Sequence, residues 1–338
     1  MENEQLTHTP CQKGRNWFYR TGLSLIGLLA CVMSSLAQTQ NVSFVPAARN
    51  LFALHNSEED RSGRVADASN EDALPPAPSY TSFLTQAPAS ETEQPAPAAN
   101  PGRPAMATPA LLTPVGYAQI ETGFLYARDS AQFSNRNSEE ETMRITVNPR
   151  TQFIIAGEPV AGSQSDDQTL VQHGDTTAGV QLVAMPGQGI KPTLSASYLR
   201  LLHGGDATSL DIGGYVNSAI LMQSADLGHF HVDCNEFFNE TEGPIRRLQT
   251  GQAAAVTYPL TPKLGAIAEL RHFTDPLAGG DGLSTLWGAA YAVRPNLVVD
   301  TGLVHGLTGT STQWQVLSGV TYVLPHRIGG FSHGSARP

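Results

Sequence analysis

The chain of 338 residues has little charge and almost no cysteine. Only 15% of its residues are Asp, Glu, Lys or Arg, whereas soluble globular domains contain roughly 25%. Its cysteines, Cys11, Cys31 and Cys234, do not make a disulfide framework. The formal net charge of -10 argues against nucleic acid as a partner, because binding to phosphates requires a basic surface. The composition therefore excludes a disulfide-stapled scaffold and disfavours a nucleic-acid-binding domain.

The chain also lacks an apolar run of comfortable length for a transmembrane helix. Its N-terminal run, Leu23 to Met33, is short and follows the basic residues Lys13, Arg15 and Arg20. It ends in Ser35-Leu36-Ala37, which places small residues three and one before a cleavage site. This order of basic, apolar and small residues predicts a secretory signal peptide that is cleaved after Ala37.

A second processing route fits the same segment. The residues Leu28-Leu29-Ala30-Cys31 resemble a bacterial lipobox, in which Cys31 becomes the lipidated first residue. Leucine is not the favoured residue just before that alanine, whereas the site at Ala37 follows the signal-peptide pattern, so we favour ordinary cleavage. Both routes carry the protein out of the cytoplasm.

Residues 38–115 are rich in proline and alanine and contain few large apolar side chains. Proline removes backbone donors, and a segment with few apolar side chains has little surface to bury. The composition predicts a disordered periplasmic arm over 38–115. An ordered domain is then expected over 116–328, with the signal peptide at 1–37 and a short tail at 329–338.

The ordered domain repeats one pattern, which is clearest from Lys191 to Met222. Two alternating runs flank a Gly- and Asp-rich connection at 203–208. Successive side chains of a strand point to opposite faces, so each run has one apolar and one mixed polar face. Both runs approach the length of about ten residues that crosses a bilayer as a tilted strand. The apolar faces contain Leu194, Ala196 and Tyr198 on the first run, and Ile212, Val216, Ile220 and Met222 on the second.

About twelve such strands are expected, and their connections alternate in length. Bacterial outer-membrane barrels have an even number of antiparallel strands, long external loops and short periplasmic turns. This rhythm predicts an all-β fold, an antiparallel up-and-down transmembrane barrel of about twelve strands after the signal peptide and the disordered arm. The long polar connections are 129–138, 157–174, 203–208, 239–247, 274–283 and 307–311; the mostly short ones are 148–150, 186–190, 223–228, 259–263 and 294–296.

The two faces of these strands differ in charge. The predicted lipid-facing bands, with Ala268 and Val299 near their centres, carry no charge, as expected if a charge at midplane costs roughly 2–4 kcal/mol. Glu236 and Arg200 are the exceptions, and both are expected near loop ends. The alternative is a secreted soluble β domain with the apolar face as its core. In the barrel, the charged residues predicted to line the lumen and set its selectivity are Glu121, Arg144, Asp211, Asp233, Glu269, Arg271 and Asp300.

Candidate chemistry is sparse. His229, His231 and Asp233 alternate along one predicted strand, and such a row can hold Zn²⁺ or Cu²⁺. No fourth ligand is specified, so an ordinary polar lumen row is the favoured interpretation, and no metal or cofactor is expected. His231 and His272 are available for a Ser-His arrangement, but no motif singles out a serine. We therefore expect no enzyme activity.

Several segments resemble one known family. HVDCNEFFNETEG, TYPLTPKLGAIAELRHFTDP, AYAVRPNLVVDTGLVHGLTGTSTQW and GVTYVLPHRI are similar to strands and turns of the outer-membrane barrels of the phenol-degradation meta-pathway transporter family, as are ETGFLYARD and KPTLSASYLRLL. The resemblance covers Gly116 to Ile328 and implies an outer-membrane transporter without established catalytic residues. The chain departs from the usual barrel at Val323-Leu324, where the last strand ends without a terminal aromatic residue.

Two functions therefore stay open for a barrel. The first is a diffusion channel or transporter for small solutes, aromatic or hydrophobic ones by the resemblance, with outer-membrane lipid around it. The second is a barrel that transports no solute, either an envelope structural protein or an enzyme of lipid metabolism. Barrels of about eight strands are filled by side chains and those of sixteen or more are open, so about twelve does not decide. The sequence does not set the oligomeric state.

Overall fold

The structure, a computed structural model, describes residues 97–165, 168–207, 210, 214–241, 247–274 and 281–328. The predicted signal peptide, the tail 329–338 and Asp211 lie outside the described residues. Within these ranges the regular elements are strands, and no helix in them is long and apolar enough to cross a membrane. The strands are β1 (Ala118–Arg128), β2 (Asn135–Asn148), β3 (Thr151–Ser165), β4 (Gln168–Gln172), β5 (Thr176–Met185), β6 (Thr193–His203), β7 (Tyr215–Leu227), β8 (Phe230–Thr241), β9 (Leu248–Pro259), β10 (Leu264–Phe273), β11 (Gly282–Arg294), β12 (Leu297–Gly306) and β13 (Trp314–Val323).

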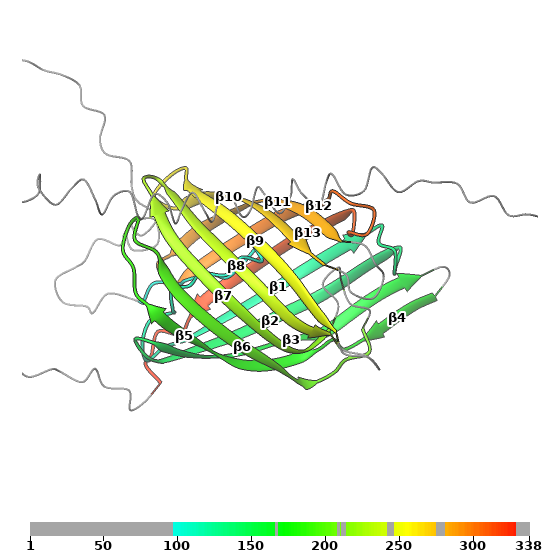
Figure 1. The fold of residues 1–338 in the computed structure, drawn as a ribbon, viewed down its shortest axis with the longest axis horizontal. Helices are drawn as coiled ribbons and strands as arrows, with labels where there is room; N and C mark the ends of the chain where they lie inside the picture. Colours follow the sequence, from blue (N-terminus) through cyan, green and yellow to red (C-terminus); the bar gives the residue numbers. More distant parts are fainter. Residues whose placement is uncertain are drawn as a thin grey trace, which may run out of the picture. The chain divides into compact units, whose positions relative to one another are not determined.

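The strands form one antiparallel sheet that closes on itself (Figure 1). From β5 to β13 each strand pairs with the next along the chain, β13 pairs with β1, and β2 joins β1 to β3. Residues 151–157 of β3 pair with β5, while residues 161–165 pair with β4. Strand β4 thus extends the wall beside β3 and leaves twelve strands around the barrel. The prediction of an all-β up-and-down barrel of about twelve strands is confirmed.

Two predicted connections are mostly strand in the structure. Much of the polar segment 157–174 is strand, because β3 continues to Ser165 and forms a hairpin with β4. Backbone ladder bonds form whatever the side-chain polarity, so a strand can continue past its apolar band. The predicted turn 223–228 is mostly strand as well. Strand β7 runs to Leu227, and Gly228, with φ of 64°, supplies the left-handed conformation for a two-residue turn.

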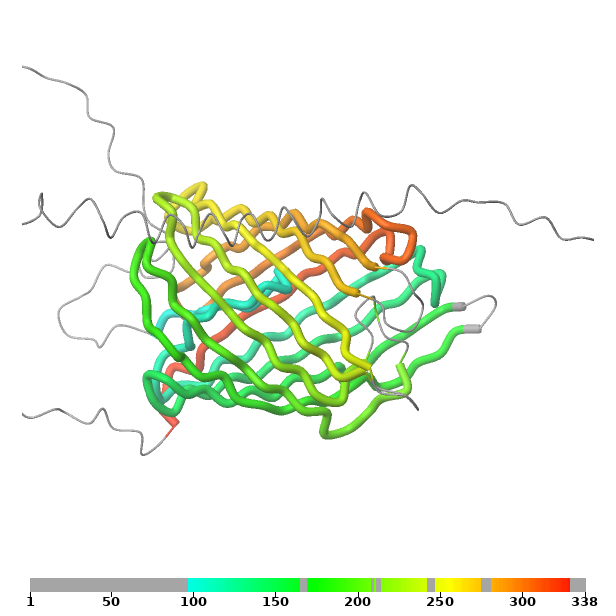
Figure 2. Tube along the Cα trace, viewed as in Figure 1, coloured from blue at the N-terminus to red at the C-terminus, as the bar shows by residue number. Residues whose placement is uncertain are grey.

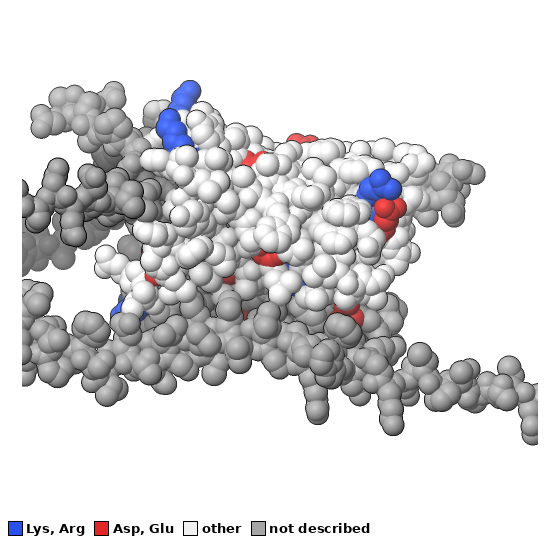
Figure 3. All heavy atoms as spheres, turned by 90° about the horizontal axis from the view of Figure 1, so that it is seen from above, with Lys and Arg blue, Asp and Glu red and all other residues white. Residues whose placement is uncertain are grey.

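The outward faces are apolar, as the alternation predicts, and the inward faces carry polar and charged side chains together with buried apolar ones such as Leu286 and Val298. Trp287 is 63% exposed, whereas Asp300, which lies on the inward face of the neighbouring β12, is 6% exposed. Figure 3 shows one side of the molecule, on which few Lys, Arg, Asp or Glu side chains appear. Glu236 faces outward near the middle of β8 rather than near a loop end, whereas Arg200 lies close to the end of β6 as expected.

The apolar side chains of β7 include an exception to this division. Ile220 and Met222 point inward and are buried, while Leu221 between them is 53% exposed on the outer surface. The apolar run that contained Ile220 and Met222 therefore does not mark a lipid face. These two side chains join Phe237 and Phe273 in an interior cluster against Ala107 and other small residues that come from before the first strand.

Residues 97–115, which we call the plug, lie inside the barrel (Figure 2). The Ala99 N–H donates to the Pro295 carbonyl in the β11–β12 turn, and the Gly116 N–H donates to the Thr146 carbonyl near the end of β2. The plug therefore enters and leaves at the end with the short turns. The sequence predicted a disordered arm over 38–115, whereas residues 97–115 have a defined path in the structure. Residues 38–96 lie outside the described residues.

The composition that predicted disorder also suits the plug to a barrel interior. Ala107 and Ala110 are 3% and 0% exposed, and such small side chains leave room for the backbone among the lumen side chains. The prolines Pro101, Pro104 and Pro109 carry no N–H group, so they place no unpaired donor in the interior. A segment too poor in apolar surface to form its own core can thus fill a cavity whose walls come from elsewhere.

Candidate functional site

Lumen side chains hold the backbone of the plug. The Gly102 N–H donates to both Glu121 carboxylate oxygens at 3.2 and 3.3 Å, and the Ala107 N–H donates to Glu269 Oε2 at 2.7 Å. The Ala110 N–H donates to Ser224 Oγ at 2.7 Å. Side chains of β1, β10 and β7 therefore replace the ladder partners that a strand would have. The plug is attached to several points of the wall without belonging to the sheet.

Arg103 is the charged residue of the plug. Its Nη1 contacts Glu140 Oε2 at 2.8 Å, and its Nε lies 3.7 Å from Asp300 Oδ1. Both acids are on the barrel wall, on β2 and β12, so the guanidinium bridges two well-separated strands. Removing one partner of an ion pair buried inside the barrel strongly destabilises the folded protein, because the other charge is left uncompensated.

Four inward glycines make room for the plug. A Cβ at Gly123 or Gly319 would lie 2.2 or 2.6 Å from atoms of the Arg103 guanidine group. A Cβ at Gly288 or Gly302 would lie 3.0 or 3.2 Å from Pro104 ring atoms. The bare backbone at these positions thus accepts the plug at close range.

The predicted lumen charges are inward where the structure describes them. Glu121, Asp233, Glu269, Arg271 and Asp300 are buried inside the barrel, whereas Asp211 is outside the described residues. Arg144 forms an ion pair with Glu121, which also binds the plug. Arg103 and its partner Glu140 were not among the predicted site residues. The signal for them was weak, since only the glycines on inward positions indicated that another segment comes close.

The predicted histidine row is not a row in the structure. His229 is exposed in the turn before β8, whereas His231 and Asp233 face the lumen. His231 Nδ1 lies 2.7 Å from Asp226 Oδ1, and its Nε2 lies 3.2 Å from Asp233 Oδ1. The Ser224 hydroxyl donates to Asp233, which directs the serine proton to the carboxylate. In the described ranges, no three His, Cys, Asp or Glu side chains are placed to share a metal ion.

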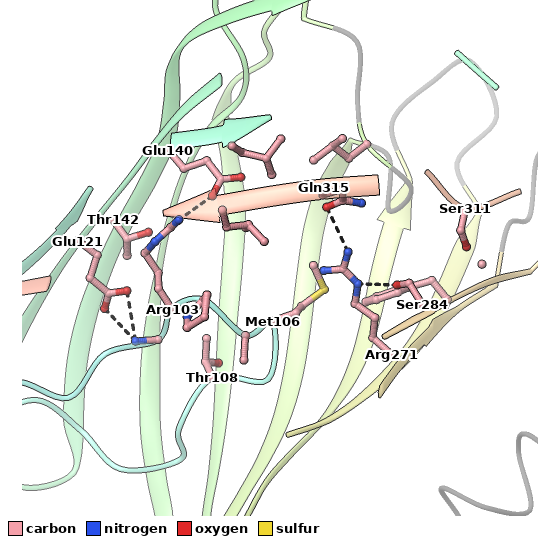
Figure 4. Close-up of a pocket in the computed structure, with 18 of the residues that line it drawn as sticks. Arg103, Met106, Thr108, Glu121, Glu140, Thr142, Arg271, Ser284, Ser311 and Gln315 are labelled. Carbon is pink, nitrogen blue, oxygen red and sulfur yellow. Dashed lines mark hydrogen bonds and ion pairs between the residues drawn. The ribbon is translucent and has the colours of Figure 1, made fainter. Parts of the chain in front are cut away.

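A cavity of about 400 Å³ lies between the plug and the wall (Figure 4). Arg103, Met106 and Thr108 of the plug line it on one side. Its wall reaches Gly282 at the start of β11 and Ser311 in the β12–β13 connection, at the end of the barrel with the long connections. The cavity therefore occupies the part of the lumen that the plug leaves unfilled. Its charged lining consists of Arg103, Arg144, Arg271, Glu121 and Glu140.

Comparison with known proteins finds similarity to solved structures alone. No family model matches the chain, and no curated protein matches its sequence. An outer-membrane channel from Pseudomonas putida F1 is 14% identical with a TM-score of 0.49, over 64% of this chain and 98% of that one. The KdgM porin in complex with disordered oligogalacturonate is 12% identical with a TM-score of 0.42, over 60% and 98%. The CymD monoaromatic hydrocarbon channel is 10% identical with a TM-score of 0.40, over 63% and 90%.

Proposed function

We propose that the protein is an outer-membrane channel for small solutes whose lumen is narrowed by its own plug. The observation that carries this proposal is the arrangement of the two faces of the closed sheet. Large apolar side chains such as Phe124 and Trp287 are exposed on the outside. Glu121, on the same strand as Phe124, and Asp300, on the strand next to that of Trp287, are buried inside the barrel. A soluble β domain would have the reverse arrangement, whereas lipid stabilises an apolar exterior.

The same proposal sets the orientation in the membrane. In barrels of this class the short turns are periplasmic and the long connections are external. The plug would then enter from the periplasm beside Pro295, and the cavity near Gly282 and Ser311 would face the outside. A solute would reach the cavity first and meet the plug next.

Passage beyond the cavity depends on the contacts of the plug. Its anchors include hydrogen bonds from backbone N–H groups to lumen side chains such as Ser224 and Glu269. In addition, the Gln181 side chain donates to plug carbonyls. Water can replace such bonds at a small net cost, because each contributes only about 1 kcal/mol, or about 1.5–3 kcal/mol when the partner is charged. Arg103 is the strongest anchor, since it joins the plug to Glu140 and Asp300. We infer that loosening the plug near Arg103 opens the path.

The finer family assignment is also a proposal. The segments TYPLTPKLGAIAELRHFTDP and AYAVRPNLVVDTGLVHGLTGTSTQW include β10 and β12 with the ends of their neighbouring strands, and their similarity to phenol-degradation meta-pathway transporters supports it. The solutes would then be small and aromatic or hydrophobic. A barrel that transports no solute is the second candidate, and the presence of the plug in the lumen favours it.

Conductance of the folded full chain in a planar bilayer tests the proposal. The wild type should carry a small current, and Arg103→Ala should increase it because both ion pairs of the plug are lost. Arg200→Ala is the matched control, since Arg200 faces outward on β6 and touches neither plug nor lumen. If neither the wild type nor Arg103→Ala conducts above the lipid baseline, a barrel that transports no solute is the better assignment.

A further inference from the structure

Arg271 on β10 is a buried cation that forms no ion pair with an acid of the described residues. It is 8% exposed on the lumen face. Its Nε donates to Ser284 Oγ at 2.8 Å and its Nη2 donates to Gln315 Oε1 at 3.3 Å, and both acceptors are neutral (Figure 4). No carboxylate of the described residues lies within 4.0 Å of its guanidinium. The other two arginines of the cavity, Arg103 and Arg144, each hold a wall carboxylate.

The acid closest along the strand is already engaged with the plug. Glu269 lies two residues before Arg271 on the same inward face, but its Oε2 accepts the Ala107 N–H at 2.7 Å. A guanidinium has five N–H donors, and Ser284 and Gln315 accept from two of them. Arg271 lines the cavity, where an anion can bind the remaining donors.

The surroundings of Arg271 define the rest of the ligand. Phe273, two residues further on β10, lines the cavity together with Leu125, Leu317 and Met106. A ligand that reaches the guanidinium therefore lays its body against apolar side chains. The volume of about 400 Å³ lies within the range of small-molecule sites. The site thus combines one cationic fork with an apolar wall.

The charge of the ligand follows from the other lining residues. Glu121 and Glu140 also line the cavity, and they are neutralised by Arg144 and Arg103. Among the described residues, Arg271 is the one guanidinium of this lining that contacts no carboxylate, so the site has room for a single negative charge. A planar carboxylate matches the guanidinium fork with two parallel hydrogen bonds. A doubly charged phosphate would meet the two nearby acids without a second free cation.

We propose that this cavity binds small monocarboxylates with an apolar or aromatic body, held by Arg271. This assignment rests on the proposed function, because it makes the carboxylate a solute of the channel. The ligand would supply the missing partner of the buried guanidinium, and its body would cover Phe273. A neutral analogue of the same shape keeps the apolar contacts and loses the charged ones.

Titration calorimetry of the detergent-folded full chain tests this site, with benzoate as the probe and benzamide as its neutral counterpart. Benzoate should bind the wild type, and benzamide should bind at least about tenfold more weakly, since hydrogen bonds to charged groups contribute about 1.5–3 kcal/mol each. Arg271→Gln should reduce benzoate affinity by a similar factor and leave benzamide unchanged. Arg200→Gln is the control and should bind like the wild type. Equal affinity of benzoate for the wild type and Arg271→Gln would overturn the assignment.

Gln315→Glu provides a second variant that keeps the cation in place. The new carboxylate lies where Gln315 Oε1 accepts from Arg271, so it should pair with the guanidinium and displace benzoate. Folding of each variant is checked by heat-modifiable gel mobility. Undiminished benzoate binding by folded Gln315→Glu would also overturn the assignment. Benzoate binding without any bilayer current would support the site and reject the channel. A bilayer current with no preference for benzoate would support the channel and reject the site.

Discussion

The guanidinium carbon of Arg103 lies where a side chain on Gly123 would begin, since a Cβ at Gly123 would come within 2.2 Å of it. The two residues come from the plug and from the middle of β1, and the bare glycine backbone allows their contact. An added methyl group has to move the guanidinium, which is the flexible end of a long side chain, while the strand stays in place. The position of this charge against the wall therefore depends on the absence of a side chain at Gly123.

The first prediction concerns this contact. Gly123→Ala should displace the Arg103 guanidinium, weaken its ion pair with Glu140, and increase the single-channel conductance in a planar bilayer. The double variant Gly123→Ala/Arg103→Ala should conduct like Arg103→Ala alone, because both changes act on the same anchor. Additive increases in the double variant would contradict a shared mechanism.

The second prediction concerns the extent of the protected chain. Proteolysis of the folded protein should leave a core that still contains residues 97–115, because Ala107 and Ala110 are buried and hydrogen-bonded to the wall. Mass spectrometry of the core gives its N-terminus. A core that begins near Gly116 would mean that the plug leaves the lumen easily.

The third prediction separates the two faces of β12. Val299 faces outward near the centre of the strand, so Val299→Arg should destabilise the inserted barrel by roughly 2–4 kcal/mol. Val299→Leu is the control and should assemble normally. Asp300→Asn on the inward face should also assemble, and it should change the ion preference measured by reversal potential in a salt gradient. Normal assembly of Val299→Arg would argue for a soluble domain.

The fourth prediction concerns orientation. A short epitope placed between Ser165 and Gln168, at the end of the β3–β4 hairpin, should be labelled on intact cells. The same epitope at Pro262, in the short β9–β10 connection, should be labelled after the outer membrane is permeabilised and not before. The reverse pattern would place the plug entrance outside the cell.

Local pattern determined the class of fold. Alternation in β10 and β12 separates Ala268 from Glu269 and Val299 from Asp300, and these neighbours lie on opposite faces of the wall as expected. The alternating connection lengths indicated an up-and-down order, because consecutive antiparallel strands need no long crossover. Both signals are carried by residues close together in the chain, so they are readable without a structure.

Contacts across the lumen could not be read in this way. Ala107 and its acceptor Glu269 are 162 residues apart, and Arg271 reaches Gln315 across 44 residues. Such pairs are set by the closure of the barrel and by the path of the plug, which no periodicity records. The inward direction of Ile220 and Met222 follows for the same reason, because the plug supplies the apolar surface that they cover.

The sequence by itself determined a closed antiparallel wall with an apolar outside, since strand period and connection length are local properties. The tertiary structure alone decided what fills that wall. A segment with the composition of a disordered arm is ordered at 97–115 because lumen side chains accept its N–H groups and inward glycines admit it. The same closure leaves Arg271 beside neutral partners, so the charge that defines the proposed solute site exists only in the folded barrel.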